Sequence, residues 1–223
     1  MKTLLPICCA LAVAMVVRAE SVESILSRMD KAAPQFRGVT ADVRMVTYTA
    51  IISDKTEESG VLKMQRKTGA VRAIIDFSGQ SDAREIAFLG NVVSIYYPNL
   101  KMVQDYDVGK NSDVLNQYLL LGFGSSGKEL AQAYDISVQS TENVAGVNAT
   151  KLLLLPKNDS VKTRLSKIEM WIPGGDAAYP IQQQFYEPSG NYRQVTYGNV
   201  KLNPSIKGNL ELKLPSGVKR RSS

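Results

Sequence analysis

A stretch of alternating residues between positions 39 and 51 constrains the fold more than any other part of the chain. Its odd positions begin with the apolar residues Val39, Ala41 and Val43, whereas the even positions include polar residues such as Asp42. Residues two apart lie on the same face of a β-strand. The stretch therefore predicts one long, half-buried strand, roughly 40 Å in length at the usual rise per residue.

Further β-prone runs follow at short intervals, and turn residues such as Gly90-Asn91 and Pro98-Asn99 separate them. Successive short strands with close turns are typical of an antiparallel meander. They predict a sheet of about eleven strands. The predicted runs are 60–65, 71–77, 84–89, 92–97, 101–106, 136–140, 149–155, 165–172, 181–186, 192–202 and 210–214.

Three segments have helical spacing instead. Residues 21–36 form a predicted amphipathic helix with Ser21 as its N-cap, and residues 112–121 and 128–134 form a predicted helical pair in the middle of the chain. We therefore expect a mostly β, α+β domain with a single antiparallel curved sheet. The N-terminal helix and the mid-chain pair would act as a lid over an apolar cavity.

The N-terminus has the features of a cleavable export signal. Lys2 precedes an apolar run from Leu4 to Val17, and small residues stand at the positions that a signal peptidase reads. We expect residues 1–19 to be removed, residues 20–218 to form one domain, and residues 219–223 to be a basic, frayed tail. A signal-anchored or acylated form, and attraction of the tail to a membrane surface, remain alternatives.

The composition disfavours several classes of protein. The chain has no histidine, and both of its cysteines, Cys8 and Cys9, lie in the predicted signal. The commonest general base, the commonest metal ligand and any thiolate nucleophile are therefore missing from the mature chain. We predict no enzyme, no cofactor and no metal. The 27 basic and 21 acidic residues are scattered, so we also predict no nucleic-acid partner.

Three motifs could carry chemistry, but each has a simpler interpretation. Gly122–Lys128 has phosphate-loop spacing, yet Glu129 stands where Ser or Thr would hold magnesium, so a turn is favoured. The acidic run 105–113 lacks the Gly and Glu positions of a calcium loop. A carboxylate pair for glycoside hydrolysis would have to come from five residues that nothing in the sequence brings together. These are Asp82, Glu85, Asp105, Asp107 and Glu169.

Arg66 is a candidate site residue because of its position on a strand. It shares strand parity with Leu62 and Met64, so its guanidinium would point into apolar surroundings if that face lines the cavity. A buried cation is costly unless it is paired, and Arg can bond carbonyls or phosphates through a planar fork. The alternative is that the strand ends near Gln65 and that Arg66 lies at the surface.

The chain resembles the LolA family of periplasmic lipoprotein-localisation carriers over essentially all of its mature length. Five segments carry the resemblance through their order and spacing. They are Gly60-Val-Leu-Lys-Met-Gln-Arg66, Val71-Arg72, Tyr97-Pro98 followed by Gln104, Leu154-Leu155-Pro156-Lys157, and Leu212-Lys-Leu-Pro215-Ser-Gly217-Val218. The sequence departs from the family at Lys67, where Pro is usual, at the Gly90-Asn91 turn, and in lacking aromatic residues around Val71 and Ala73.

The resemblance implies a periplasmic, incomplete β-barrel whose concave side receives the acyl chains of lipoproteins. Cargo would come from an inner-membrane transporter and pass to an outer-membrane receptor, and Arg66 would help to close the lid by bonding its backbone. A shuttle for other lipids, a lipid-binding sensor and a partner-binding module of the same fold are the alternatives. We expect a monomer.

Ten further residues are candidates for the lipid-binding wall or lid, and for each of them an ordinary core position is the alternative. They are Leu62, Met64, Ile86, Phe88, Val93, Ile95, Leu115, Tyr118, Leu119 and Phe123.

Overall fold

A computed structural model describes residues 20–67, 70–77, 79, 82–107, 109 and 121–222 of the chain. The predicted signal, residues 1–19, lies outside the described residues. So does nearly all of the predicted helix 112–121.

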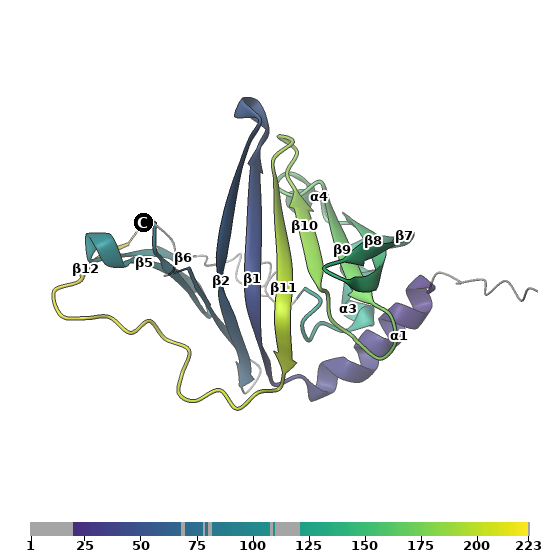
Figure 1. The fold of residues 1–223 in the computed structure, drawn as a ribbon, viewed down its shortest axis with the longest axis horizontal. Coiled ribbons are helices and arrows are strands. Elements are labelled where there is room, and N and C mark those ends of the chain that lie inside the picture. Colours follow the sequence, from purple (N-terminus) through teal and green to yellow (C-terminus); the bar gives the residue numbers. More distant parts are fainter. Residues whose placement is uncertain are drawn as a thin grey trace, which may run out of the picture.

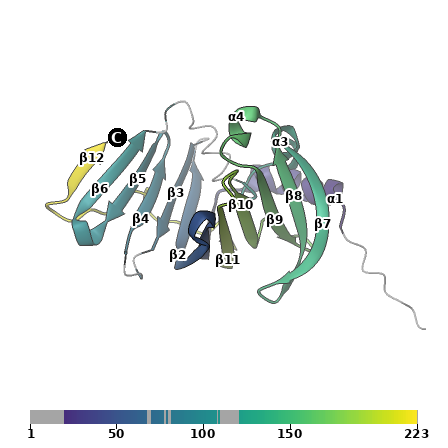
Figure 2. The same ribbon diagram turned by 90° about the horizontal axis from the view of Figure 1, so that it is seen from above.

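Twelve strands form one curved sheet that is not closed into a barrel, with β12 and β7 at its two ends (Figures 1 and 2). The order across the sheet is β12-β6-β5-β4-β3-β2-β1-β11-β10-β9-β8-β7. Neighbouring strands are antiparallel except for β12 and β6, which are parallel. The strands are β1 Gly38–Thr49, β2 Asp54–Lys67, β3 Ala70–Asp76, β4 Glu85–Leu89, β5 Val92–Tyr97, β6 Met102–Asp107, β7 Tyr134–Val144, β8 Val147–Pro156, β9 Lys167–Pro173, β10 Gln182–Tyr186, β11 Tyr192–Leu202 and β12 Lys219–Ser222.

The predicted curved sheet is confirmed, but the C-terminal part of the chain differs from the prediction. Residues 210–214 form no strand, and the predicted frayed tail is wrong because Lys219–Ser222 pair with Met102–Asp105 of β6. Arg220 also lies 3.4 Å from a carboxylate oxygen of Asp105. The reason is that the outer edge of β6 offers backbone groups that the tail can pair with. Such a distant partner leaves no local pattern in the sequence.

The N-terminal helix α1 (Val22–Ala32) begins where the sequence predicts. The Ser21 side chain accepts a hydrogen bond from the backbone N–H of Ser24, and Pro34 lies in the short turn η1 (Ala33–Gln35) that ends the helical segment. The other described helices are α3 (Gly127–Ala133) and α4 (Asp159–Lys162). In the part of the chain that the structure describes, no helix has the length and apolar character needed to cross a membrane.

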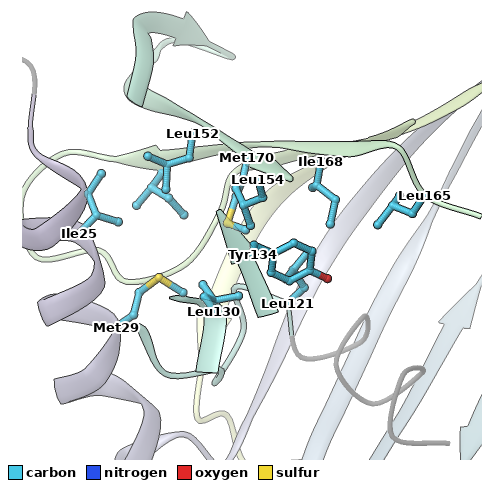
Figure 3. Packing of buried hydrophobic residues seen from close by; sticks show 11 residues of the cluster. Ile25, Met29, Leu121, Leu130, Tyr134, Leu152, Leu154, Leu165, Ile168 and Met170 are labelled. Carbon is cyan, nitrogen blue, oxygen red and sulfur yellow. The ribbon is translucent and has the colours of Figure 1, made fainter. Parts of the chain in front are cut away.

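Two apolar clusters lie between the sheet and the segments that pack against it. The first packs α1 and α3 against β8 and β9, and its members include Ile25, Met29, Leu130, Leu154 and Met170 (Figure 3).

The second cluster packs Phe36 and Phe123 against the inner faces of β1, β2 and β3, where Val43, Leu62 and Met64 lie. Leu121 belongs to the first cluster and Phe123 to the second. The turn 121–124 therefore joins the two halves of the core.

Candidate functional site

A cavity of about 750 Å³ lies on the concave side of the sheet. Most of its wall is apolar and comes from β1, β2, β3, β4, β10 and β11. The apolar wall residues are Val43, Met45, Leu62, Met64, Ile75, Phe77, Phe88, Phe123, Val161, Leu165, Phe185, Val195 and Tyr197. This volume is in the range of sites that hold small molecules, and its lining suits an apolar ligand.

In one part of the cavity, the aromatic rings of Phe123 and Tyr197 lie beside the side-chain amide of Gln183. The ring of Phe123 meets that of Tyr197 edge-on, with centroids 4.9 Å apart. The Tyr197 hydroxyl donates to Oε1 of Gln183 (2.8 Å), and Nε2 of Gln183 donates to the backbone oxygen of Leu121 (3.0 Å). Burial raises the pKa of the Tyr197 phenol. The phenol therefore stays neutral and keeps its hydrogen bond.

Apart from the buried Gln183, the polar residues that line the cavity are exposed or half-buried and form its rim. We call this set the polar rim, and it comprises Ser160, Thr163, Arg164, Glu187 and Arg193. The Arg193 guanidinium lies 4.0 Å from the Glu187 carboxylate, and its side chain is 62% exposed. The cavity thus combines an apolar interior with a charged, solvent-exposed edge, as a site for an amphipathic ligand requires.

Arg66 holds the turn 121–124 in place. Its guanidinium donates to the backbone oxygen of Gly124 (2.8 Å) and to that of Ala33 (3.3 Å), and it lies 5.3 Å from the centre of the Phe36 ring. The side-chain amide of Gln183 donates a second hydrogen bond to this turn, at the backbone oxygen of Leu121. Arg66 therefore lies at the inner face of the sheet, as its strand parity predicts, and β2 continues past it to Lys67.

Gly124 allows this turn to approach the core closely. Its φ is +82°, and a Cβ at this position would collide with the ring of Phe36. Gly146 is a matched control, because its φ is +85° and a Cβ there would meet no atom within 4 Å. Both alanine variants lose the conformational freedom of glycine, but only one introduces a clash.

We expect Gly124→Ala to lower the free energy of unfolding by about 2 kcal/mol more than Gly146→Ala does, because only Gly124→Ala overpacks the core. Chemical denaturation of the two variants and the wild type measures this difference. Equal destabilisation of both variants would mean that the turn moves away from Phe36 without cost.

The predicted wall residues fall into three groups. Leu62, Met64, Phe88 and Phe123 line the cavity. Ile86, Val93 and Ile95 are half-buried and share a face with Phe88, because the register pairs Phe88 with Val93 and Ile86 with Ile95, but they are not among the cavity-lining residues that are described. The predicted lid residues Leu115, Tyr118 and Leu119 lie outside the described residues.

Sequence reasoning missed much of the wall that β1, β10 and β11 contribute. Met45, Phe185 and Val195 line the cavity, and so does Gln183, which is 2% exposed. The alternation in residues 39–51 and 192–202 indicated that Met45 and Val195 lie on strands. It could not show which face of those strands borders a cavity.

The candidate carboxylates for glycoside hydrolysis do not contribute to the described cavity. The carboxylates of Asp82, Glu85, Asp105, Asp107 and Glu169 are absent from its described lining. Glu169 instead contacts the amino groups of Lys151 and Lys167, each at 2.9 Å. Burial opposes the charge of this carboxyl, but the hydrogen bonds from the two lysines outweigh it and lower its pKa.

The segment with phosphate-loop spacing, residues 122–128, forms a turn that leads into α3. This is the interpretation that the sequence favours. Glu129 completes a capping box with Ser126, because each side chain bonds the backbone of the other residue. Glu129, the residue that departs from the nucleotide-binding motif, thus has a structural role as a cap of α3.

Neither a protein-family model nor a curated protein sequence matches the chain. Several solved structures do match. An uncharacterized conserved protein from Thermus thermophilus shows 12% identity and a TM-score of 0.54 over 92% of this chain and all of its own.

The lipoprotein LppX of Mycobacterium tuberculosis shows 16% identity and a TM-score of 0.50 over 85% of this chain and 99% of its own. A LolA superfamily protein from Nitrosomonas europaea is also among the matches, at 13% identity and a TM-score of 0.39 over 84% of this chain and 96% of its own.

The chain shares its fold with the Thermus thermophilus protein and with LppX: an open curved sheet with helices packed against it. The resemblance predicted from the sequence is thus confirmed at the level of the fold.

Proposed function

We propose that this protein is a periplasmic carrier that holds the acyl chains of lipoproteins and transfers them from the inner to the outer membrane. One observation carries the proposal: the concave side of the sheet holds an apolar cavity of about 750 Å³ with a charged rim. An acyl chain would occupy the apolar part, and the polar part of the cargo would remain at the rim.

The energetics of acyl burial fit a carrier. Each buried methylene contributes about 0.8 kcal/mol, so about fourteen methylenes give roughly 11 kcal/mol before the cost of ordering the chain. That is enough to hold cargo through the aqueous space. Release then requires either a competing apolar surface or a movement that opens the cavity, and the turn 121–124 borders the cavity through Phe123.

The remaining parts of the proposal come from the resemblance and the predicted signal. The export signal in residues 1–19 would place the mature protein in the periplasm. A transporter in the inner membrane would supply the cargo, and a receptor in the outer membrane would accept it. We propose no covalent step, because holding an acyl chain requires only an apolar wall, which the cavity supplies.

Saturable binding of an acyl probe tests the proposal. We expect the purified mature protein to bind a fluorescent fatty-acyl probe at one site with a dissociation constant of micromolar order, corresponding to about 8 kcal/mol. A synthetic triacylated lipopeptide should displace the probe. A protein that binds neither molecule would favour the partner-binding module over the carrier. Displacement by free phospholipid but not by lipopeptide would favour a shuttle for other lipids.

A further inference from the structure

The hairpin formed by β1 and β2 ends in an apolar tip. The turn η2 (Ala50–Ile52) joins the two strands, and the side chains of Ile51 and Ile52 are 91% and 68% exposed. These are the highest exposures among the large apolar residues in the described part of the chain. In Figure 1 this dark-blue turn projects beyond the ends of the neighbouring strands.

The tip is held in a fixed shape. The Ala50 backbone N–H donates to Oδ1 of Asn191 (2.9 Å), and the Ser53 N–H donates to the backbone oxygen of Ala50 (3.1 Å). Below the turn, the rings of Tyr48 and Tyr192 stack with centroids 5.0 Å apart. The two isoleucines are therefore presented to solvent by an ordered, braced hairpin.

The tip lies at the same end of the sheet as the polar rim of the cavity. Thr47 of β1 is the register partner of Arg193, which belongs to the rim. From Thr47, β1 continues for two residues, about 7 Å at the usual rise, before the turn begins. A flat surface that touches the tip would therefore come close to the rim.

We propose that the Ile51-Ile52 tip inserts into the interface of a lipid bilayer and so brings the polar rim to the membrane surface. This inference rests on the proposed function. A bilayer is favoured over a protein partner because two protruding side chains supply far less area than the roughly 800 Å² per partner of a stable protein interface.

The residues at the base of the tip also suit a bilayer. Tyr48 and Tyr192 have amphipathic rings, which are favoured at head-group level. The Lys55 amino group lies 5.8 Å from the centre of the Tyr48 ring, where it can approach lipid phosphates. An acyl chain that leaves the bilayer would then meet Arg193 before it enters the cavity.

A double variant, Ile51→Ser with Ile52→Ser, tests the proposal. The matched control is Leu100→Ser, because Leu100 is 66% exposed and lies in η3 (Pro98–Leu100), a turn between β5 and β6 on the other wing of the sheet. Each protein is mixed with vesicles of phosphatidylethanolamine and phosphatidylglycerol that contain a fluorescent acyl lipid. The rate of uptake is measured, and flotation with the vesicles and binding of a soluble acyl probe are measured separately.

We expect the double variant to take up lipid roughly tenfold more slowly and to float less with vesicles, with an unchanged affinity for the soluble probe. The control should behave as wild type. Uptake and flotation equal to wild type would overturn the proposal, as would losses of the same size in the Leu100→Ser control. If wild type binds no acyl probe, the proposed carrier function fails, and flotation alone then decides whether the tip contacts lipid.

Discussion

Replacing Val195 with tryptophan is expected to abolish most acyl-chain binding while the fold is retained. Val195 is half-buried on β11 and lines the cavity, so the larger indole would enter empty space rather than filled core. If the indole displaces three methylenes of the ligand, binding weakens by about 2.4 kcal/mol, or roughly fiftyfold. Titration with the fluorescent acyl probe measures this loss.

The matched control for this variant is Val61→Trp. Val61 is 39% exposed, and its neighbour Leu62 points to the inner face, so Val61 points to the outer face of β2. We expect Val61→Trp to bind the probe as wild type does, and both variants to give wild-type circular dichroism spectra. If Val195→Trp also bound like wild type, the acyl chain would have to lie somewhere other than this cavity.

Replacing Arg66 with leucine is expected to preserve the fold and to impair cargo transfer. The variant removes the donors to the backbone oxygens of Gly124 and Ala33, which costs about 1–3 kcal/mol for carbonyls that lose their partners. The turn 121–124 would then lose its attachment to β2. We expect at least a tenfold slower transfer of a triacylated lipopeptide from loaded protein to acceptor membranes.

The control for Arg66→Leu is Arg44→Leu. Arg44 lies on a strand and pairs with Glu57, but its side chain is 54% exposed. An exposed ion pair contributes little to stability, so this variant should transfer cargo normally. Arg66→Lys tests the geometry of the guanidinium, because a lysine keeps the charge but cannot bond both carbonyls through a fork. Normal transfer by a well-folded Arg66→Leu variant would remove Arg66 from the site.

The order of the strands along the chain was largely predictable from sequence, because period-two alternation and turn residues are local signals. The run at 192–202 coincides with β11, and the run at 92–97 coincides with β5. The C-terminal strand could not be predicted in this way. Lys219–Ser222 are polar and exposed, and only the edge of β6, more than a hundred residues earlier, makes them a strand.

The candidate site was predictable in part. Strand parity placed Arg66 beside Leu62 and Met64, and the structure adds the bond to Gly124 that gives the arginine its structural role. Gln183 could not be recognised, because a polar residue in a strand is usually expected on the solvent face. Its burial depends on Leu121, which lies 62 residues earlier, and on Tyr197 of the neighbouring strand β11. The lid residues Leu115, Tyr118 and Leu119 remain predictions.

The central claim is that the cavity carries acyl chains, and native mass spectrometry tests it most directly. The mature protein would be purified from its own periplasm without detergent, and any bound molecule would be released and identified. We predict a bound acylated polypeptide in wild type and its loss in Val195→Trp. A wild-type protein that is empty, and that also fails to bind added acyl chains, would contradict the account.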